Sequence, residues 1–158
     1  MTFAAAPAPV VIDASVAVDL ALGEGPDLPA AVRRWIAEDR MMLTPAAYWT
    51  EVGHAILRRA GGDSIEAARR LGSLEAIGMQ TADRSAPGVR MALALAERHR
   101  LSVYDATYLW LAIDVDGELA TFDTALVSAA AAEGVPLALE ALGADRHGSR
   151  TPWPSLQP

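Results

Sequence analysis

The sequence contains no cysteine and no lysine; all of its basic residues are arginines. Without cysteine, disulfides, thiolate catalysis and zinc–thiolate sites are excluded, which fits a protein of the cytosol. Without lysine, a Walker-type phosphate-binding loop is excluded as well, because that loop needs its lysine to reach the phosphates.

Long apolar runs are also missing. No stretch of about twenty apolar residues occurs, so we expect no segment that spans a membrane. The opening residues 1–9 have neither a basic start nor a long apolar run. We therefore expect no signal peptide.

The chain has 158 residues, of which 52% are apolar, and this predicts one globular domain with its own core. Its net charge of −7 counts against an ordinary nucleic-acid-binding protein, which is usually basic. A metal-dependent nuclease is a different case. It uses carboxylates to hold cations, and the cations then neutralise the phosphate.

Short β-branched or apolar runs alternate with helical stretches along the chain. We predict strands at 10–13, 41–43, 79–81, 119–122 and 137–139, with helices between them. This order indicates an α/β domain with a mostly parallel central sheet of about four to five strands, covered on both faces. We divide the chain into an N-terminal tail (1–9), the domain (10–142) and a flexible C-terminal tail (143–158) that is rich in proline, glycine and polar residues.

Two aspartates end predicted strands. Asp13 follows the first strand and Asp123 the fourth, and functional crevices in such sheets lie at the carboxyl ends of strands. Thr121 points to the same face of its strand as Asp123, and two polar groups on a buried face need a partner. The alternative is that each aspartate only caps the helix that follows it. Ser15 either supports the same site or is an ordinary helix-start serine.

Two further acids lie on predicted helices. Asp105 is in the first turn of a largely apolar helix, where Ser102 and Asp105 also form a capping-box-like pair. Glu51 lies two turns into a helix that we expect to begin at Thr44–Pro45, with Thr44 as its N-cap. For Asp105 the alternative is a capping role, and for Glu51 it is a solvent-facing side chain.

The four acids together predict a site for a hard cation. Mg²⁺ prefers oxygen ligands, and converging carboxylates repel one another unless a cation joins them. Such a site can activate a water, orient a phosphate and stabilise a leaving oxygen.

The sequence around these acids resembles the motifs of PIN-domain nucleases, in order and spacing. The third and fourth segments are the most specific, and the resemblance covers about residues 10–140. The similar segments are residues 11–15 (Val-Ile-Asp-Ala-Ser), 43–45 leading to Glu51, 104–109 (Tyr-Asp-Ala-Thr-Tyr-Leu) and 121–126 (Thr-Phe-Asp-Thr-Ala-Leu). Order, spacing and length are similar to VapC-type toxins of bacterial type II toxin–antitoxin systems.

The resemblance implies a three-layer α/β/α fold and a Mg²⁺- or Mn²⁺-dependent endoribonuclease of the bacterial cytoplasm. It implies that Asp13, Glu51, Asp105 and Asp123 are the catalytic, metal-binding acids, with Ser15 and Thr121 as supporting polar groups. It also implies an RNA substrate, a homodimer and a cognate VapB-type antitoxin.

Two other interpretations stay open. The same fold could be a non-catalytic module that only binds an antitoxin or RNA. A phosphotransfer protein with Asp13 as phosphoacceptor is the other, although receiver domains and haloacid-dehalogenase-like phosphatases both imply a nearby lysine, which this sequence lacks.

Overall fold

The computed structural model describes residues 6–25 and 27–139. Over these residues the chain alternates short strands with helices, as the sequence predicts. The elements are β1 (Val10–Ile12), α1 (Ala14–Leu22), α2 (Leu28–Ala37), β2 (Met42–Thr44), α3 (Tyr48–Arg59), α4 (Ser64–Glu75), β3 (Gln80–Thr81), α5 (Ser85–His99), α6 (Val103–Asp114), β4 (Glu118–Ala120) and α7 (Thr124–Glu133). The predicted tail at 143–158 lies outside the described residues.

The four strands form one parallel sheet in the order β3-β2-β1-β4. The predicted fifth strand at 137–139 is reduced to a single parallel bridge between Leu119 and Leu137. The predicted strand at 119–122 ends early, at Ala120. Beyond Ala120, the Phe122 N–H donates to the Ser15 hydroxyl.

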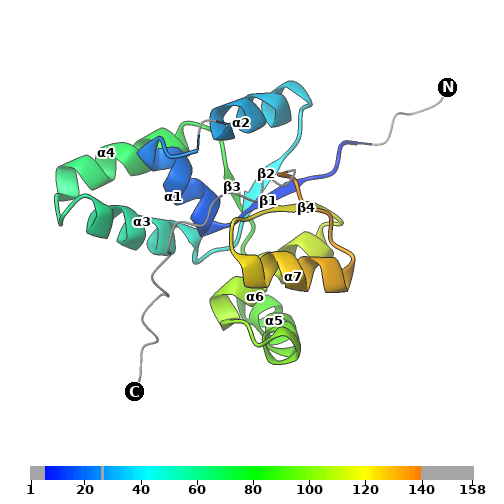
Figure 1. Ribbon diagram of the computed structural model, residues 1–158. Coiled ribbons are helices and arrows are strands. Elements are labelled where there is room, and N and C mark those ends of the chain that lie inside the picture. The colour runs from blue at the N-terminus through cyan, green and yellow to red at the C-terminus, as the bar shows by residue number, and fades with distance from the viewer. Residues whose placement is uncertain (1–5, 26, 140–158) are drawn as a thin grey trace, which may run out of the picture.

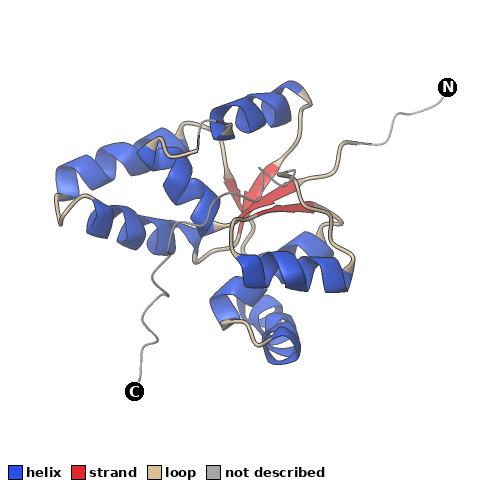
Figure 2. Cartoon of the chain, viewed as in Figure 1, coloured by secondary structure: helices blue, strands red, loops and turns tan. Residues whose placement is uncertain are grey.

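Helices cover both sides of this sheet, which gives the three-layer α/β/α arrangement (Figures 1 and 2). Helices α1, α3 and α4 contact one another, and α2 contacts α1, whereas α6 contacts both α5 and α7 on the other side. Strand β1 lies between them and is fully buried from Val10 to Ile12. No helix in the described part of the chain has the length and apolar character needed to cross a membrane.

The beginning of α3 differs from the prediction. Thr44 is not a helix cap; it is the buried last residue of β2, where it pairs with Thr81 and its carbonyl accepts from the Ala82 N–H. Helix α3 starts only at Tyr48. Local capping chemistry was overridden by strand pairing, so Glu51 lies in the first turn of its helix and not two turns into it.

Candidate active site

The structure brings the four predicted acids to one edge of the sheet. Asp13 directly follows β1, Asp123 caps α7 just after β4, and Asp105 and Glu51 lie in the first turns of α6 and α3. They are close enough for their charges to act on one another. Asp105 and Asp123 both raise the pKa of Asp13, and Asp13 and Asp105 both raise the pKa of Glu51.

Asp13 is the most enclosed of the four, with 3% of its surface exposed. Its Oδ2 accepts from the Ser15 hydroxyl at 2.6 Å and from the Thr121 hydroxyl at 2.8 Å. Although Asp13 stands at the start of α1, its side chain makes no capping hydrogen bond, so the capping alternative is wrong for this residue. Burial raises the pKa of Asp13 to about 6, against the lowering effect of the two hydroxyls.

The two hydroxyls are themselves held by backbone. Ser15 Oγ accepts from the Phe122 N–H at 3.0 Å, and Thr121 Oγ1 accepts from the Asp123 N–H at 3.0 Å. Because each oxygen is occupied as an acceptor, its proton is directed to Asp13. Both bonds end on Oδ2, and within the described chain no hydrogen bond uses Oδ1 of Asp13. Ser15 and Thr121 thus contact Asp13, and their role as supporting groups of a metal site stays a prediction.

Asp123 acts as a helix cap, and Asp105 is bound to the residue that caps its helix, Ser102. Asp123 Oδ1 accepts from the Leu126 N–H at 2.9 Å. At the start of α6, Ser102 Oγ accepts from the Asp105 N–H at 3.0 Å and donates to Asp105 Oδ2 at 2.6 Å. Burial, together with the charge of Asp123, nonetheless raises the pKa of Asp105. Capping and membership of the acidic group are thus compatible for these two residues.

The Glu51 side chain is half-buried, which contradicts the alternative of a solvent-facing glutamate. Its Oε2 accepts from the Tyr108 hydroxyl at 2.8 Å. Burial raises the pKa of Glu51 to about 7, and the hydrogen bond from Tyr108 partly opposes this shift. Tyr108 escaped the sequence analysis because it looked like one more apolar residue of α6. The available signal was that a buried tyrosine needs a partner for its hydroxyl.

No positive side chain neutralises this edge: none of the ion pairs between described residues includes Asp13, Glu51, Asp105 or Asp123. The donor set fits a hard cation, because all of the donors are oxygens that repel one another. The spacing does not yet fit, since no three acidic or histidine side chains of residues 6–25 and 27–139 are placed to hold one ion.

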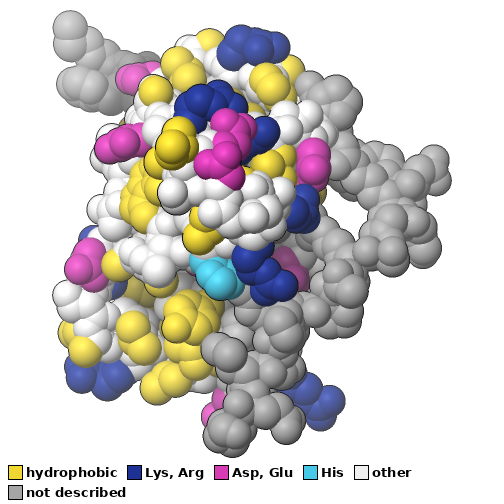
Figure 3. Space-filling model, turned by 90° about the vertical axis from the view of Figure 1, so that its left-hand side faces the viewer, with side chains coloured by type: hydrophobic (Ala, Val, Ile, Leu, Met, Phe, Trp, Pro, Cys, Tyr) yellow, Lys and Arg dark blue, Asp and Glu magenta, His cyan; other side chains and the backbone are white. Residues whose placement is uncertain are grey.

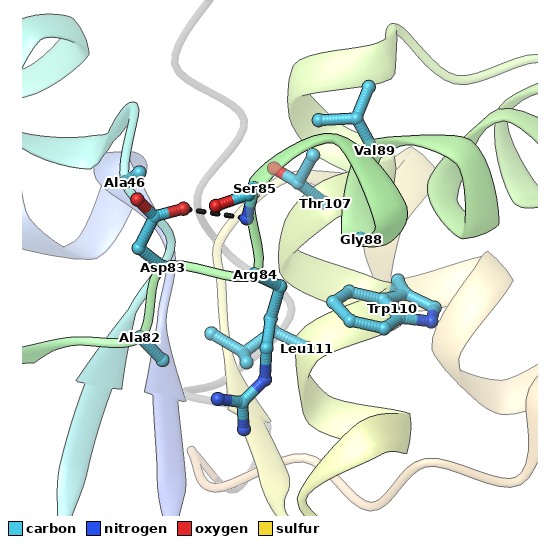
Figure 4. Close-up of a pocket in the computed structure, with 10 residues that line it drawn as sticks. All are labelled: Ala46, Ala82, Asp83, Arg84, Ser85, Gly88, Val89, Thr107, Trp110 and Leu111. Atoms are coloured by element: carbon cyan, nitrogen blue, oxygen red, sulfur yellow. Dashed lines mark hydrogen bonds between the residues drawn. The ribbon is translucent and has the colours of Figure 1, made fainter.

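A shallow hollow of about 80 Å³ lies beside this edge, at the carboxyl ends of β2 and β3 (Figure 4). It is lined by Ala46, Ala82, Asp83, Arg84, Ser85, Gly88, Val89, Thr107, Trp110 and Leu111. Its charged groups already have partners. Asp83 accepts from the Ser85 N–H, and Arg84 pairs with Asp114 at 2.9 Å. The hollow is far smaller than a typical ligand pocket of about 300 Å³ or more, so the acids remain the better candidate site.

The face formed by the α1, α3 and α4 side of the molecule shows no separate basic patch (Figure 3). Three arginines of α3 and α4 pair with acidic side chains: Arg59 with Glu24, and Arg69 and Arg70 with Glu66. These arginines are therefore not free to balance a phosphate on this face.

Comparisons with known proteins agree with this architecture. The model of the PIN domain family matches residues 10–132. The chain is 32% identical to Ribonuclease VapC1 of Mycobacterium tuberculosis over 127 residues, which are 80% of this chain and 92% of that protein.

Solved structures show the same fold. PAE2754 from Pyrobaculum aerophilum aligns with a TM-score of 0.60 and 22% identity, over 77% of this chain and 79% of that one. VapC20 of Mycobacterium tuberculosis, described as a sarcin–ricin loop cleaving toxin, aligns with a TM-score of 0.59 and 19% identity, over 76% of this chain and 94% of that one. The chain belongs to the PIN-domain family, and within it to the VapC type.

Proposed function

We propose that this protein is a Mg²⁺- or Mn²⁺-dependent endoribonuclease that acts as the toxin of a toxin–antitoxin pair. The observation that carries the proposal is the buried Asp13 carboxylate, which faces the negative charges of Asp105 and Asp123 and has no ion pair with any residue that the structure describes. Placing ionised carboxylates together in a poorly solvated position is costly, and functional sites are where such arrangements occur. The likeness to Ribonuclease VapC1 supports RNA as the substrate.

The metal would be held by Asp13, Asp105, Asp123 and Glu51, whose oxygens are the donors that Mg²⁺ and Mn²⁺ prefer. When bound, such an ion lowers the pKa of water and offsets the charge of a phosphodiester. Because the chain has a net charge of −7, the ion would supply positive charge that the phosphate of the substrate needs.

The residues of the chain itself supply the fixed part of the site. Ser15 and Thr121 hold Oδ2 of Asp13, which leaves Oδ1 as its free ligand atom. The capping bonds of Asp105 and Asp123 likewise fix the first turns of α6 and α7. Water attack at a phosphodiester held here would leave a 5′-phosphate and a 3′-hydroxyl.

The same proposal includes a cognate VapB-type antitoxin that blocks the site, and a homodimer. The rival is a non-catalytic binding module, and one observation favours it: the carboxylates are not spaced to ligate a single ion as they stand. An inactive module has no need to bind a divalent cation, so metal binding separates the two.

The test is calorimetric titration with Mn²⁺ of the wild type, of Asp13→Asn and of the control Asp116→Asn. Asp116 is exposed, lies in the turn before β4 and has a φ of 49°, a conformation that asparagine tolerates. We expect binding by the wild type and by Asp116→Asn, and at least about a 10-fold loss in Asp13→Asn. The proposal fails if the wild type binds no Mn²⁺, or if Asp13→Asn binds it equally well.

A further inference from the structure

Tyr108 links two helical layers that lie on opposite sides of the sheet. It lies on α6, three residues after Asp105, and its hydroxyl donates to Glu51 of α3 at 2.8 Å. Helix α3 packs with α1 and α4, whereas α6 packs with α5 and α7 on the other side of the sheet. The hydrogen bond therefore joins the two helical layers at the carboxyl ends of the strands.

The environment of Tyr108 leaves its hydroxyl little freedom. Only 1% of the residue is exposed, so the ring is held by the core and the hydroxyl is carried to a defined position. Glu51, by contrast, is a long side chain in the first turn of a helix and would otherwise sample several rotamers. Within the described residues, Tyr108 is the hydrogen-bond partner of the Glu51 carboxylate.

We propose that Tyr108 is a positioning residue that acts through Glu51, by holding its carboxylate toward Asp13 and Asp105. Asp13 thus has Ser15 and Thr121 as its hydroxyl partners, and Glu51 has Tyr108. Outer partners of this kind orient ligands and raise metal affinity. The inference rests on the proposed function, because it assigns Tyr108 to the metal site named there.

The test compares Tyr108→Phe, which removes only the hydroxyl, with Tyr104→Phe. Tyr104 lies on the same helix but is 64% exposed, so it is a matched control. Each substitution is made in the wild type and in Glu51→Gln, and Mn²⁺ affinity is measured by calorimetry without RNA, beside kcat and KM for RNA cleavage and the midpoint of thermal unfolding.

We expect Tyr108→Phe to weaken Mn²⁺ binding by about 10-fold and to lower kcat more than it changes KM. Tyr104→Phe should leave all of these values unchanged. In the Glu51→Gln background the further effect of Tyr108→Phe should fall to about twofold or less, because the two residues act as one unit.

Three results would overturn the inference alone, while the wild type still binds Mn²⁺ and cuts RNA. Tyr108→Phe could match Tyr104→Phe, or its loss could be as large in Glu51→Gln as in the wild type. It could also fail to fold, which would make the hydroxyl a requirement of the core. A wild type that binds no Mn²⁺ overturns the proposed function instead, and this inference with it.

Discussion

The two edges of the central sheet both carry carboxylates, but among the described residues an arginine pairs with a carboxylate at only one of these edges. At the amino ends of the strands, Arg40 pairs with Glu118 at 2.8 Å and donates to the Ala8 carbonyl at 2.7 Å. At the carboxyl ends, Asp13 and its acidic neighbours have hydroxyl and amide partners, and none of them pairs with an arginine or histidine in the described part of the chain. At the first edge the carboxylate has a counter-ion, whereas at the second the carboxylates repel one another, and a bound cation would relieve that repulsion.

Among the substitutions that compare the two edges, Asp13→Asn should have the largest effect. The change keeps the shape of the side chain and an oxygen for Ser15 and Thr121, but it removes the charge. We expect RNA cleavage to fall by at least about 100-fold, because a metal-binding carboxylate is lost. The metal-free protein should become more stable, since a buried charge no longer has to be desolvated. Cleavage assays and urea unfolding measure the two effects; loss of both activity and stability would make Asp13 a structural residue.

Lowering the pH should stabilise the metal-free protein. Burial raises the pKa of Asp13 from 3.8 to about 6, so between these values the folded state holds a proton that the unfolded state releases. The protonation of Asp13 should therefore increase the free energy of unfolding by up to about 2 kcal/mol as the pH falls from 7 to 4.5. Glu51, with a pKa raised to about 7, acts in the same direction.

Urea unfolding between pH 4.5 and 7.5 measures how the stability of the metal-free protein depends on pH, with Asp13→Asn as the control. The free energy of unfolding should change less steeply with pH in Asp13→Asn than in the wild type. With saturating Mn²⁺ the dependence on pH should be weaker still. A wild type whose stability rises with pH over this range would show that the acids are not held in a repulsive arrangement.

Arg40→Gln should have the opposite effects to Asp13→Asn: it should lower stability and leave metal binding unchanged. The Arg40 side chain is 9% exposed, and removing it leaves Glu118 and the Ala8 carbonyl without their partner. We expect a loss of about 2 kcal/mol in the free energy of unfolding, with unchanged Mn²⁺ affinity. A change in metal affinity in this variant would mean that the two edges are coupled.

Thr121→Val should give the smallest effect. Valine keeps the shape but leaves Asp13 with Ser15 as its only hydroxyl donor, and it removes the acceptor for the Asp123 N–H. We expect Mn²⁺ affinity to fall by about 10-fold. Thr121→Ser retains the hydroxyl and is the control. Equal affinity in both variants would show that the hydroxyl does not orient Asp13.

The sequence was informative where function follows from local position. Asp13 and Asp123 could be placed at one edge because both end predicted strands, and the carboxyl ends of parallel strands meet. The cap of α6 is also local, because Ser102 accepts from the N–H of Asp105, three residues further along the chain.

Long-range pairing explains what the sequence did not predict. Tyr108 binds Glu51 although 57 residues separate them in the sequence, and no local pattern near either residue predicts this contact. Thr44 had the local pattern of a helix cap, but its pairing with Thr81 in a neighbouring strand decided its structure. The roles of the four acids as metal ligands stay predictions, because they depend on an ion.

The central claim is that the unneutralised edge of the sheet cuts RNA. Its most direct test is to express the wild type and Asp105→Asn in a bacterial host without antitoxin, and to sequence newly formed 5′-phosphate RNA ends. Asparagine still fits the cap with Ser102, so this variant should fold. We expect discrete new ends with the wild type alone, and these ends would identify the target RNA. The same ends from both proteins would contradict the account, because cleavage would not depend on the Asp105 carboxylate.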